Sequence, residues 1–185
     1  MLIKLSQLLE DLREDHRNLA LLLDLLEAES EHVDGDDEPD FELLHDIMQY
    51  MTVYSDAVHH PREDLVYEAM REHSAELAAD LESIGPDHRE IAELGSTLRS
   101  DIEAVISGTA VTRDRLLSDL QGYVARLRQH IAWEEDDLFP RADSMARENG
   151  SASIDMALFK DADPLFGATT AASFSNLLSH LQEHE

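Results

Sequence analysis

Ten histidines accompany 41 acidic residues in this 185-residue chain, and some of them recur at helical spacing. His59 with Glu63 and His130 with Glu134 are two pairs whose members are four residues apart. Residues at this spacing lie one above the other on a helix, so each pair presents an imidazole nitrogen and a carboxylate oxygen to one side. Such donors favour a metal site, although i, i+4 pairs are also common on exposed helix faces.

Two single histidines extend this set because each interrupts a row of apolar residues. His16 follows Leu12 by four residues and precedes Leu19 by three, and His88 precedes Ile91 by three. A polar side chain inside an apolar stripe is costly to bury without a partner. Either histidine alone would be read as a hydrogen-bonded core residue. Together with the two His-x-x-x-Glu pairs, they give one inward imidazole to each of four helical segments.

Four inward imidazoles and two inward carboxylates need a common partner. In a core of helices packed about 8–10 Å apart, these side chains can converge on one point. Around two cations, the carboxylates would bridge and the imidazoles would be terminal ligands. The donor set holds no sulfur, since the chain has no cysteine. It therefore suits iron or manganese, with zinc as an alternative.

The net charge of −27 narrows the choice of partners. Nucleic-acid affinity comes mainly from Lys and Arg, so we expect no binding to DNA, RNA or anionic membranes. The acidic surface would favour solubility, and it would also attract cations. The absence of cysteine excludes disulfides and iron–sulfur ligation. We find neither a secretory signal nor an apolar stretch long enough to span a bilayer, and we expect a cytoplasmic protein.

The elements that position these residues are predicted to be helices, because glycine and proline are scarce and apolar residues recur three and four apart. The expected segments are Leu5–His32, Asp40–His60, Arg62–Leu81, Asp87–Val105 and Thr112–Asn149. Asp40 and Thr112 are expected to cap their helices. Pro61 should either kink its helix or restart it, with the proline in the first turn.

Long amphipathic helices joined by short loops predict an all-α fold, an antiparallel up-down four-helix bundle formed by residues 1–150. Residues 151–185 are expected to form a C-terminal helical extension packed on the bundle. Within it we expect a short helix over 154–160, a turn at 163–167 and a last helix over 173–184.

Four segments of the chain resemble the signatures of the hemerythrin-like, HHE cation-binding family. They are EDHR at 14–17, HHPREDL at 59–65, DHR at 87–89 and HIAWEEDDLFP at 130–140. The resemblance covers about residues 1–148, and its second and fourth segments are the specific ones. It implies a four-helix bundle around a non-haem di-iron centre. The residues that match the terminal ligands are His16, His59, His88 and His130, and those that match the bridges are Glu63 and Glu134.

The sequence departs from the oxygen-carrying hemerythrins at a fifth histidine, which they place one turn along the third helix. Here Ala92 stands four residues after His88, and Ile84 stands four before it. His60 is our candidate for the missing ligand, because some relatives place a ligand directly after the histidine of the second helix. At about 100° round the helix from His59, it could otherwise point to solvent.

The other titratable residues are expected to lie outside the ligand set. The remaining histidines are expected at the surface: His32, His45, His73, His180 and His184. Three tyrosines are expected in the core, where one could hydrogen-bond a ligating group: Tyr50, Tyr54 and Tyr123. Glu135 is an alternative bridge to Glu134 if the fourth helix is slightly rotated.

A di-iron centre with an open coordination position suits dioxygen, nitric oxide or peroxide. We therefore expect a protein that binds or senses dioxygen or nitric oxide, or buffers iron, rather than an enzyme. The alternative is a di-iron oxidase, peroxidase, nitric-oxide reductase or iron-centre repair protein. Repair proteins of this fold often carry a cysteine-containing amino-terminal segment, which this sequence does not contain. A purely structural bundle would leave six inward polar residues unexplained.

Overall fold

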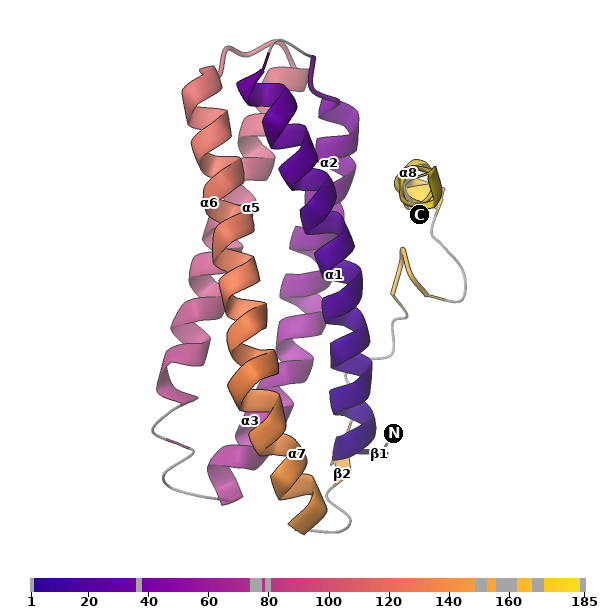
Figure 1. Ribbon diagram of the computed structural model, residues 1–185, viewed down its shortest axis with the longest axis vertical. Coiled ribbons are helices and arrows are strands. Elements are labelled where there is room, and N and C mark those ends of the chain that lie inside the picture. The colour runs from indigo at the N-terminus through magenta and orange to yellow at the C-terminus, as the bar shows by residue number, and fades with distance from the viewer. Residues whose placement is uncertain are drawn as a thin grey trace.

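The computed structural model describes residues 2–35, 38–73, 78, 81–148, 153–155, 163–167 and 172–183. Helices dominate this part of the chain, which confirms the all-α prediction (Figure 1). The α-helices are α1 (Leu5–Asp34), α2 (Phe41–Tyr50), α3 (His60–His73), α5 (Ile84–Ile106), α6 (Arg113–Trp133), α7 (Phe139–Glu148) and α8 (Ser175–Glu183). The π-helical segments are η1 (Met51–His59) and η3 (Glu134–Leu138), and the 3-10 segments are η2 (Leu81–Ser83) and η4 (Ala172–Phe174).

The long helices pack side by side as a helical bundle, and successive segments run in alternate directions in Figure 1. Helix α1 packs against α6, α6 against α5, α5 against α2, and α2 against α1. One segment is continuous through α2, η1 and α3, and another through α6, η3 and α7. Among the described residues, none of the helices combines the length and apolar character that crossing a membrane requires.

The bundle interior holds two separate apolar clusters, and the predicted ligands lie between them. In α1, Leu12 belongs to one cluster and Leu19 to the other, with His16 between the two. In α5, His88 likewise lies between Ile84 and Ile91. Because apolar burial is the main favourable term in folding, a polar layer that divides the core must be stabilised by something other than apolar contact.

Two helix starts agree with the capping signals in the sequence. Asp40 accepts a hydrogen bond from the Leu43 amide at 2.9 Å, and Thr112 caps α6, as predicted. The third helix differs from its expected start at Asp87, because α5 begins at Ile84. Pro86 lies in its first turn, where a residue needs no amide hydrogen for the helix.

The second and fourth segments each contain a π-helical stretch that the sequence analysis did not predict. His60 donates its amide to the carbonyl of Ser55, and Phe139 donates its amide to that of Glu134, both five residues back. Each stretch ends two residues before a proline, Pro61 or Pro140. A proline ring clashes with the carbonyl four residues earlier, and a wider turn relieves that contact. Pro61 lies in the first turn of α3, as predicted for a restart, but the helix continues through the wider turn and does not break there.

The wider turn in the second segment also corrects the phase of the helix. On an uninterrupted α-helix, the buried residues of α2 and those of α3 would be centred about 100° apart, which is the rotation of one residue. The residues compared are those with no exposed surface, which are Leu44, Ile47 and Met48 in α2 with Met51 at the start of η1, and Glu63, Val66, Tyr67 and Met70 in α3. The stretch η1 absorbs that extra residue, so both faces point inward.

A small sheet that the sequence analysis missed joins the start of the chain to the segment after α7. Strand β1 (Leu2–Lys4) pairs antiparallel with β2 (Ser153–Asp155), with Ile3 opposite Ile154. The helix predicted from Ile154 is therefore wrong at its start, because the backbone there pairs with a distant strand. Residues 156–160 of that prediction lie outside the described residues.

The C-terminal part contacts α2. Asp163 caps its own turn, accepting from the amides of Leu165 and Phe166 at 2.8 Å, and its other carboxylate oxygen accepts the Tyr50 hydroxyl at 2.8 Å. Helix α8 also packs against α2, and Leu177 is buried in the same cluster as the α2 residues.

Candidate metal centre

All seven residues predicted to bind metal are buried, and the structure brings them together. None has more than 8% of its surface exposed, and both glutamates are fully buried. They are His16 in α1, His59 at the end of η1, His60 and Glu63 in α3, His88 in α5, His130 in α6 and Glu134 at the start of η3. Every long segment of the bundle therefore supplies at least one of them.

Glu63 lies between two groups of imidazoles. Its Oε1 atom is 3.1 Å from Nε2 of His16 and 3.1 Å from Nε2 of His59. Its Oε2 atom is 3.6 Å from Nε2 of His88. One carboxylate thus reaches both groups with different oxygens.

Glu134 lies between the same two groups from the other side. Its Oε1 atom is 3.2 Å from Nε2 of His130 and 4.0 Å from Nε2 of His88. Its Oε2 atom is 3.4 Å from Nε2 of His16. Glu135, the alternative bridge, lies instead on the outer side of His16 and pairs with its Nδ1 atom at 2.7 Å.

The imidazoles divide unequally between the two groups. In the three-histidine group, His60, His88 and His130 stand with Glu63, and their ligand atoms all lie within 4.8 Å of one another. In the two-histidine group, His16 and His59 meet the same limit with Glu63. His60 stacks on His88, with ring centroids 4.3 Å apart, and so faces the centre rather than solvent.

Each of the five imidazoles has a carboxylate beside its Nδ1 atom. The pairs are His16 with Glu135 at 2.7 Å, His59 with Asp15 at 3.2 Å, His60 with Asp56 at 3.5 Å, His88 with Asp64 at 3.6 Å, and His130 with Asp87 at 3.6 Å. A carboxylate on one ring nitrogen favours the tautomer whose other nitrogen carries a free lone pair. Only the Nδ1 atoms of His16 and His59 are hydrogen-bonded to their carboxylates. At His60, His88 and His130 the carboxylate stands 3.5–3.6 Å away, and the Nε2 atom has no hydrogen-bond partner among the described residues, which leaves it available to a cation.

Several polar atoms of the centre have no hydrogen-bond partner among the described residues. They are Nε2 of His60, Nε2 of His88, both ring nitrogens of His130, Oε2 of Glu63 and Oε2 of Glu134. Buried polar atoms without partners are rare in native proteins, and each costs free energy. A cation that accepts these lone pairs would remove the cost at the nitrogens and oxygens facing the centre. The residues present therefore fit a metal.

The imidazoles differ in their protonation behaviour. Burial lowers the pKa of His59, but the charges of Glu63 and Asp15 outweigh it and raise the pKa to about 9. His16 is affected in the same way, and its pKa is raised well above the ordinary value. At His60, burial dominates and the pKa is lowered. His60 is thus neutral, the form that binds a metal.

The two glutamates remain anionic in spite of their surroundings. Burial and the charge of the other glutamate act to raise the pKa of Glu63, yet the neighbouring imidazoles hold it at about 2. Imidazoles also hold the pKa of Glu134 well below its ordinary value, against the effect of burial. Two buried carboxylates this close together repel each other, and positive charge between them offsets the repulsion.

Three supporting residues were not identified from the sequence. Tyr67 donates a hydrogen bond to Oε1 of Glu134 at 2.5 Å, and Phe139 stacks on His16 with ring centroids 5.2 Å apart. Asp15 accepts hydrogen bonds from Tyr54 at 3.2 Å and from Arg62 at 2.8 Å. Tyr67 stands four residues after Glu63, so its helical spacing was the available signal.

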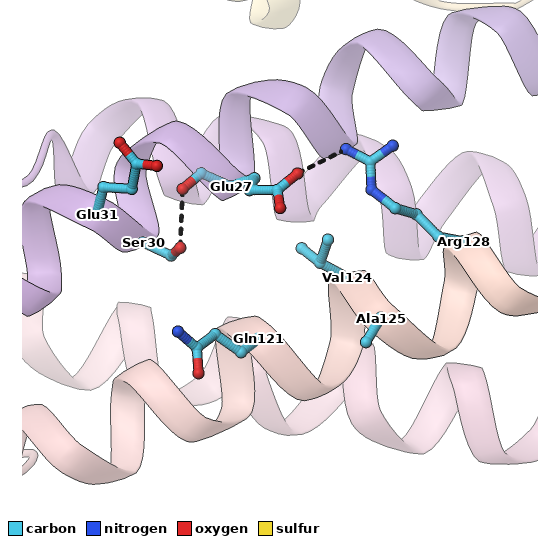
Figure 2. Close-up of a pocket in the computed structure, with 7 residues that line it drawn as sticks. All are labelled: Glu27, Ser30, Glu31, Gln121, Val124, Ala125 and Arg128. Carbon is cyan, nitrogen blue, oxygen red and sulfur yellow. Dashed lines mark hydrogen bonds and ion pairs between the residues drawn. The ribbon is translucent and has the colours of Figure 1, made fainter.

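The surface groove in Figure 2 is separate from the centre. It lies between α1 and α6, and it is lined by Glu27, Ser30, Glu31, Gln121, Val124, Ala125 and Arg128. Within it, Arg128 contacts Glu27 at 3.0 Å and Ser30 donates to the Glu27 carbonyl at 2.8 Å. None of the seven predicted ligands lines this groove.

Comparison with known proteins agrees with the geometry of the centre. Residues 7–142 match the family model described as the hemerythrin HHE cation binding domain. No curated protein and no solved structure matches the chain. The matched stretch contains all seven buried ligand candidates and covers more than half of the chain. The chain therefore belongs to the hemerythrin HHE cation-binding family.

Proposed function

We propose that the seven buried residues hold two iron ions and that the protein binds or senses dioxygen or nitric oxide. The observation that supports this most strongly is the placement of Glu63 and Glu134, each of which offers one oxygen to either group of imidazoles. Nitrogen and oxygen donors without sulfur suit iron, and they would also take manganese or zinc. When bound in the ferrous state, the iron pair supplies electrons and a coordination position to the small molecule.

The unequal division of imidazoles suggests where a small ligand would bind. The three-histidine group offers more protein donors than the two-histidine group. We therefore place the open position in the two-histidine group, beside His16 and His59. Phe139 stacks on His16, and Leu12 and Leu138 belong to the same buried cluster as Phe139. These apolar side chains keep water away from that position, which favours reversible binding of a small apolar molecule.

The architecture inferred for this function is an antiparallel up-down four-helix bundle formed by residues 1–150, with residues 151–185 as an extension packed on it. The contacts of α8 and of the 163–167 turn with α2 support that division. In this arrangement all ligands come from the bundle itself. Loss of the extension should then leave the metal content at two ions per chain.

Spectroscopy of iron-loaded protein tests the function. The protein is loaded anaerobically with ferrous iron, the bound metal is counted, and dioxygen is then admitted while the visible spectrum is recorded. A new absorption that disappears under vacuum supports reversible binding. Rapid, irreversible oxidation with turnover of dioxygen or peroxide would instead favour a di-iron enzyme. Failure to bind iron would refute the metal assignment. The His45→Ala protein, which loses a histidine outside the centre, is the matched control and should bind as much iron as wild type.

A further inference from the structure

Tyr67 is a buried tyrosine that contacts one of the bridging candidates directly. It lies on α3, one turn after Glu63, and its side chain is fully buried in a cluster with Leu138 and Phe139. Its hydroxyl donates to Oε1 of Glu134 at 2.5 Å. The hydroxyl thus links α3 to η3 across the centre.

This hydrogen bond makes the two oxygens of Glu134 unequal. Oε1, which receives the hydroxyl, faces the three-histidine group, 3.2 Å from Nε2 of His130. Oε2 faces His16, and it has no hydrogen-bond partner among the described residues. A hydrogen bond to a carboxylate oxygen withdraws electron density and weakens its donation to a cation. The weakened oxygen is on the side that already has three imidazoles.

The contact between Tyr67 and Glu134 is a short hydrogen bond to a carboxylate. The hydroxyl is the donor and Oε1 of Glu134 is the acceptor, 2.5 Å apart. Such charge-assisted hydrogen bonds are short and stronger than neutral ones, so Glu134 is held in one orientation.

We propose that Tyr67 is a positioning residue that fixes the orientation of Glu134 and raises the reduction potential of the bound metal pair. The proposal rests on the proposed function, since it presupposes iron between the two groups. A weaker carboxylate donor stabilises the more positive ion less, so the ferrous state gains relative to the ferric state. Without the hydroxyl, Glu134 becomes the stronger donor and the potential falls.

The test compares the full-length Tyr67→Phe protein with wild type and with Tyr123→Phe, which removes the same hydroxyl from a buried tyrosine that is not hydrogen-bonded to a ligand candidate. Each protein is loaded anaerobically with iron, its metal content is counted, and its midpoint potential is measured by redox titration. We expect a lower midpoint potential in Tyr67→Phe than in wild type, and the wild-type potential in Tyr123→Phe. An unchanged potential in a fully loaded Tyr67→Phe protein would overturn the proposal.

A second variant separates donor strength from packing. Replacement of Tyr67 by 3-fluorotyrosine makes the phenol a stronger donor with little change in volume, so we expect a higher potential than in wild type. Cobalt(II)-loaded proteins give a readout without redox chemistry, and their visible spectra should change in both Tyr67 variants. An unchanged potential and spectrum in the fluorotyrosine protein contradict the proposal. Failure of the wild-type protein to bind iron would refute the proposed function instead.

Discussion

The long segments of the bundle contribute to the candidate metal centre in two different ways. Helices α1 and α5 are uninterrupted, and each supplies one imidazole, His16 or His88. The other two segments contain π-helical stretches, and each supplies a carboxylate together with its imidazoles. A regular helix can bring one ligand to the centre by apolar spacing alone. A segment that must also bring a carboxylate across the centre does so beside a wider turn, a feature common at functional sites.

The first prediction, with the largest expected effect, compares a deletion in each kind of segment. Deletion of the exposed residue Ser96 would rotate the first half of α5 by about 100° relative to the second half. His88 would leave the centre, and Ile84 and Ile91 would leave the core at about 1.5–3 kcal/mol each. We expect loss of metal and a free energy of unfolding lowered by at least about 3 kcal/mol. Metal analysis and urea denaturation measure both effects.

The matching deletion removes Val53, a half-exposed residue of η1, in a protein that also carries Pro61→Ala. The stretch should become an ordinary α-helix, because the deletion removes its extra residue and the substitution removes the proline ring. His59 and Glu63 would still face inward, so we expect full metal content. Pro61→Ala alone is the control. Equal loss of metal from the two deletions would contradict the phase argument.

The second prediction concerns the unequal groups of imidazoles. His59→Ala leaves the two-histidine group with one imidazole, so we expect the metal content to fall from two ions to one per chain. His60→Ala leaves two imidazoles with Glu63, so we expect two ions, bound more weakly. Metal analysis at saturation and after dialysis against a chelator distinguishes the two outcomes. His45→Ala, outside the centre, should match wild type. Loss of one ion from His60→Ala but not from His59→Ala would contradict the division into a three-histidine and a two-histidine group.

The third prediction tests the support that regular α1 gives to the irregular segment. Asp15 accepts from Nδ1 of His59 at 3.2 Å and from Arg62 at 2.8 Å. Asp15→Asn removes the charge that holds the His59 tautomer, and such changes beside a ligand cost about 10–100-fold in metal affinity. Competition with a chromophoric zinc chelator measures the loss. Asp11→Asn is the control, since Asp11 is more exposed and lies 3.7 Å from Arg62. Equal metal affinities in the Asp15→Asn and Asp11→Asn proteins would show that Asp15 does not support His59 as a ligand.

Three of the residues that the sequence identified interrupt an apolar stripe on a regular stretch of helix, whereas His59 and Glu63 were identified by their i, i+4 spacing and the family motif. His16, His88 and His130 could be placed this way because α-helical periodicity holds up to each of them. His60 could not, because its direction depends on the phase of α3 after η1. Tyr67 stands four residues after Glu63 on α3, but its contact with Glu134 depends on how the second and fourth segments pack, which the spacing does not give.

Other features had no local signal in the sequence. Strand β2 is three residues long, and its partner Leu2–Lys4 lies about 150 residues away along the chain. Pairing of that kind is fixed by where the helices place the two strands, not by the pattern of a short segment. The family resemblance was readable because its motifs are local. Four of the five carboxylates beside Nδ1 come from a different segment than their histidine and become visible only in three dimensions, whereas Asp56 lies four residues before His60.

The last prediction contrasts two glycines in the regular helices, away from the ligands. A Cβ atom at Gly95 would stand 3.1 Å from Cε2 of Tyr123 and 3.2 Å from Cγ2 of Thr52, whereas one at Gly122 would meet nothing within 4 Å. Gly122→Ala should therefore stabilise the protein by about 0.5–1 kcal/mol through helix propensity. Gly95→Ala gains the same propensity, but the buried Tyr123 ring has little room to move, and overpacking costs about 1–3 kcal/mol. Urea denaturation should give opposite signs for the two, and a stabilising Gly95→Ala would show that α5 can move away from its neighbours.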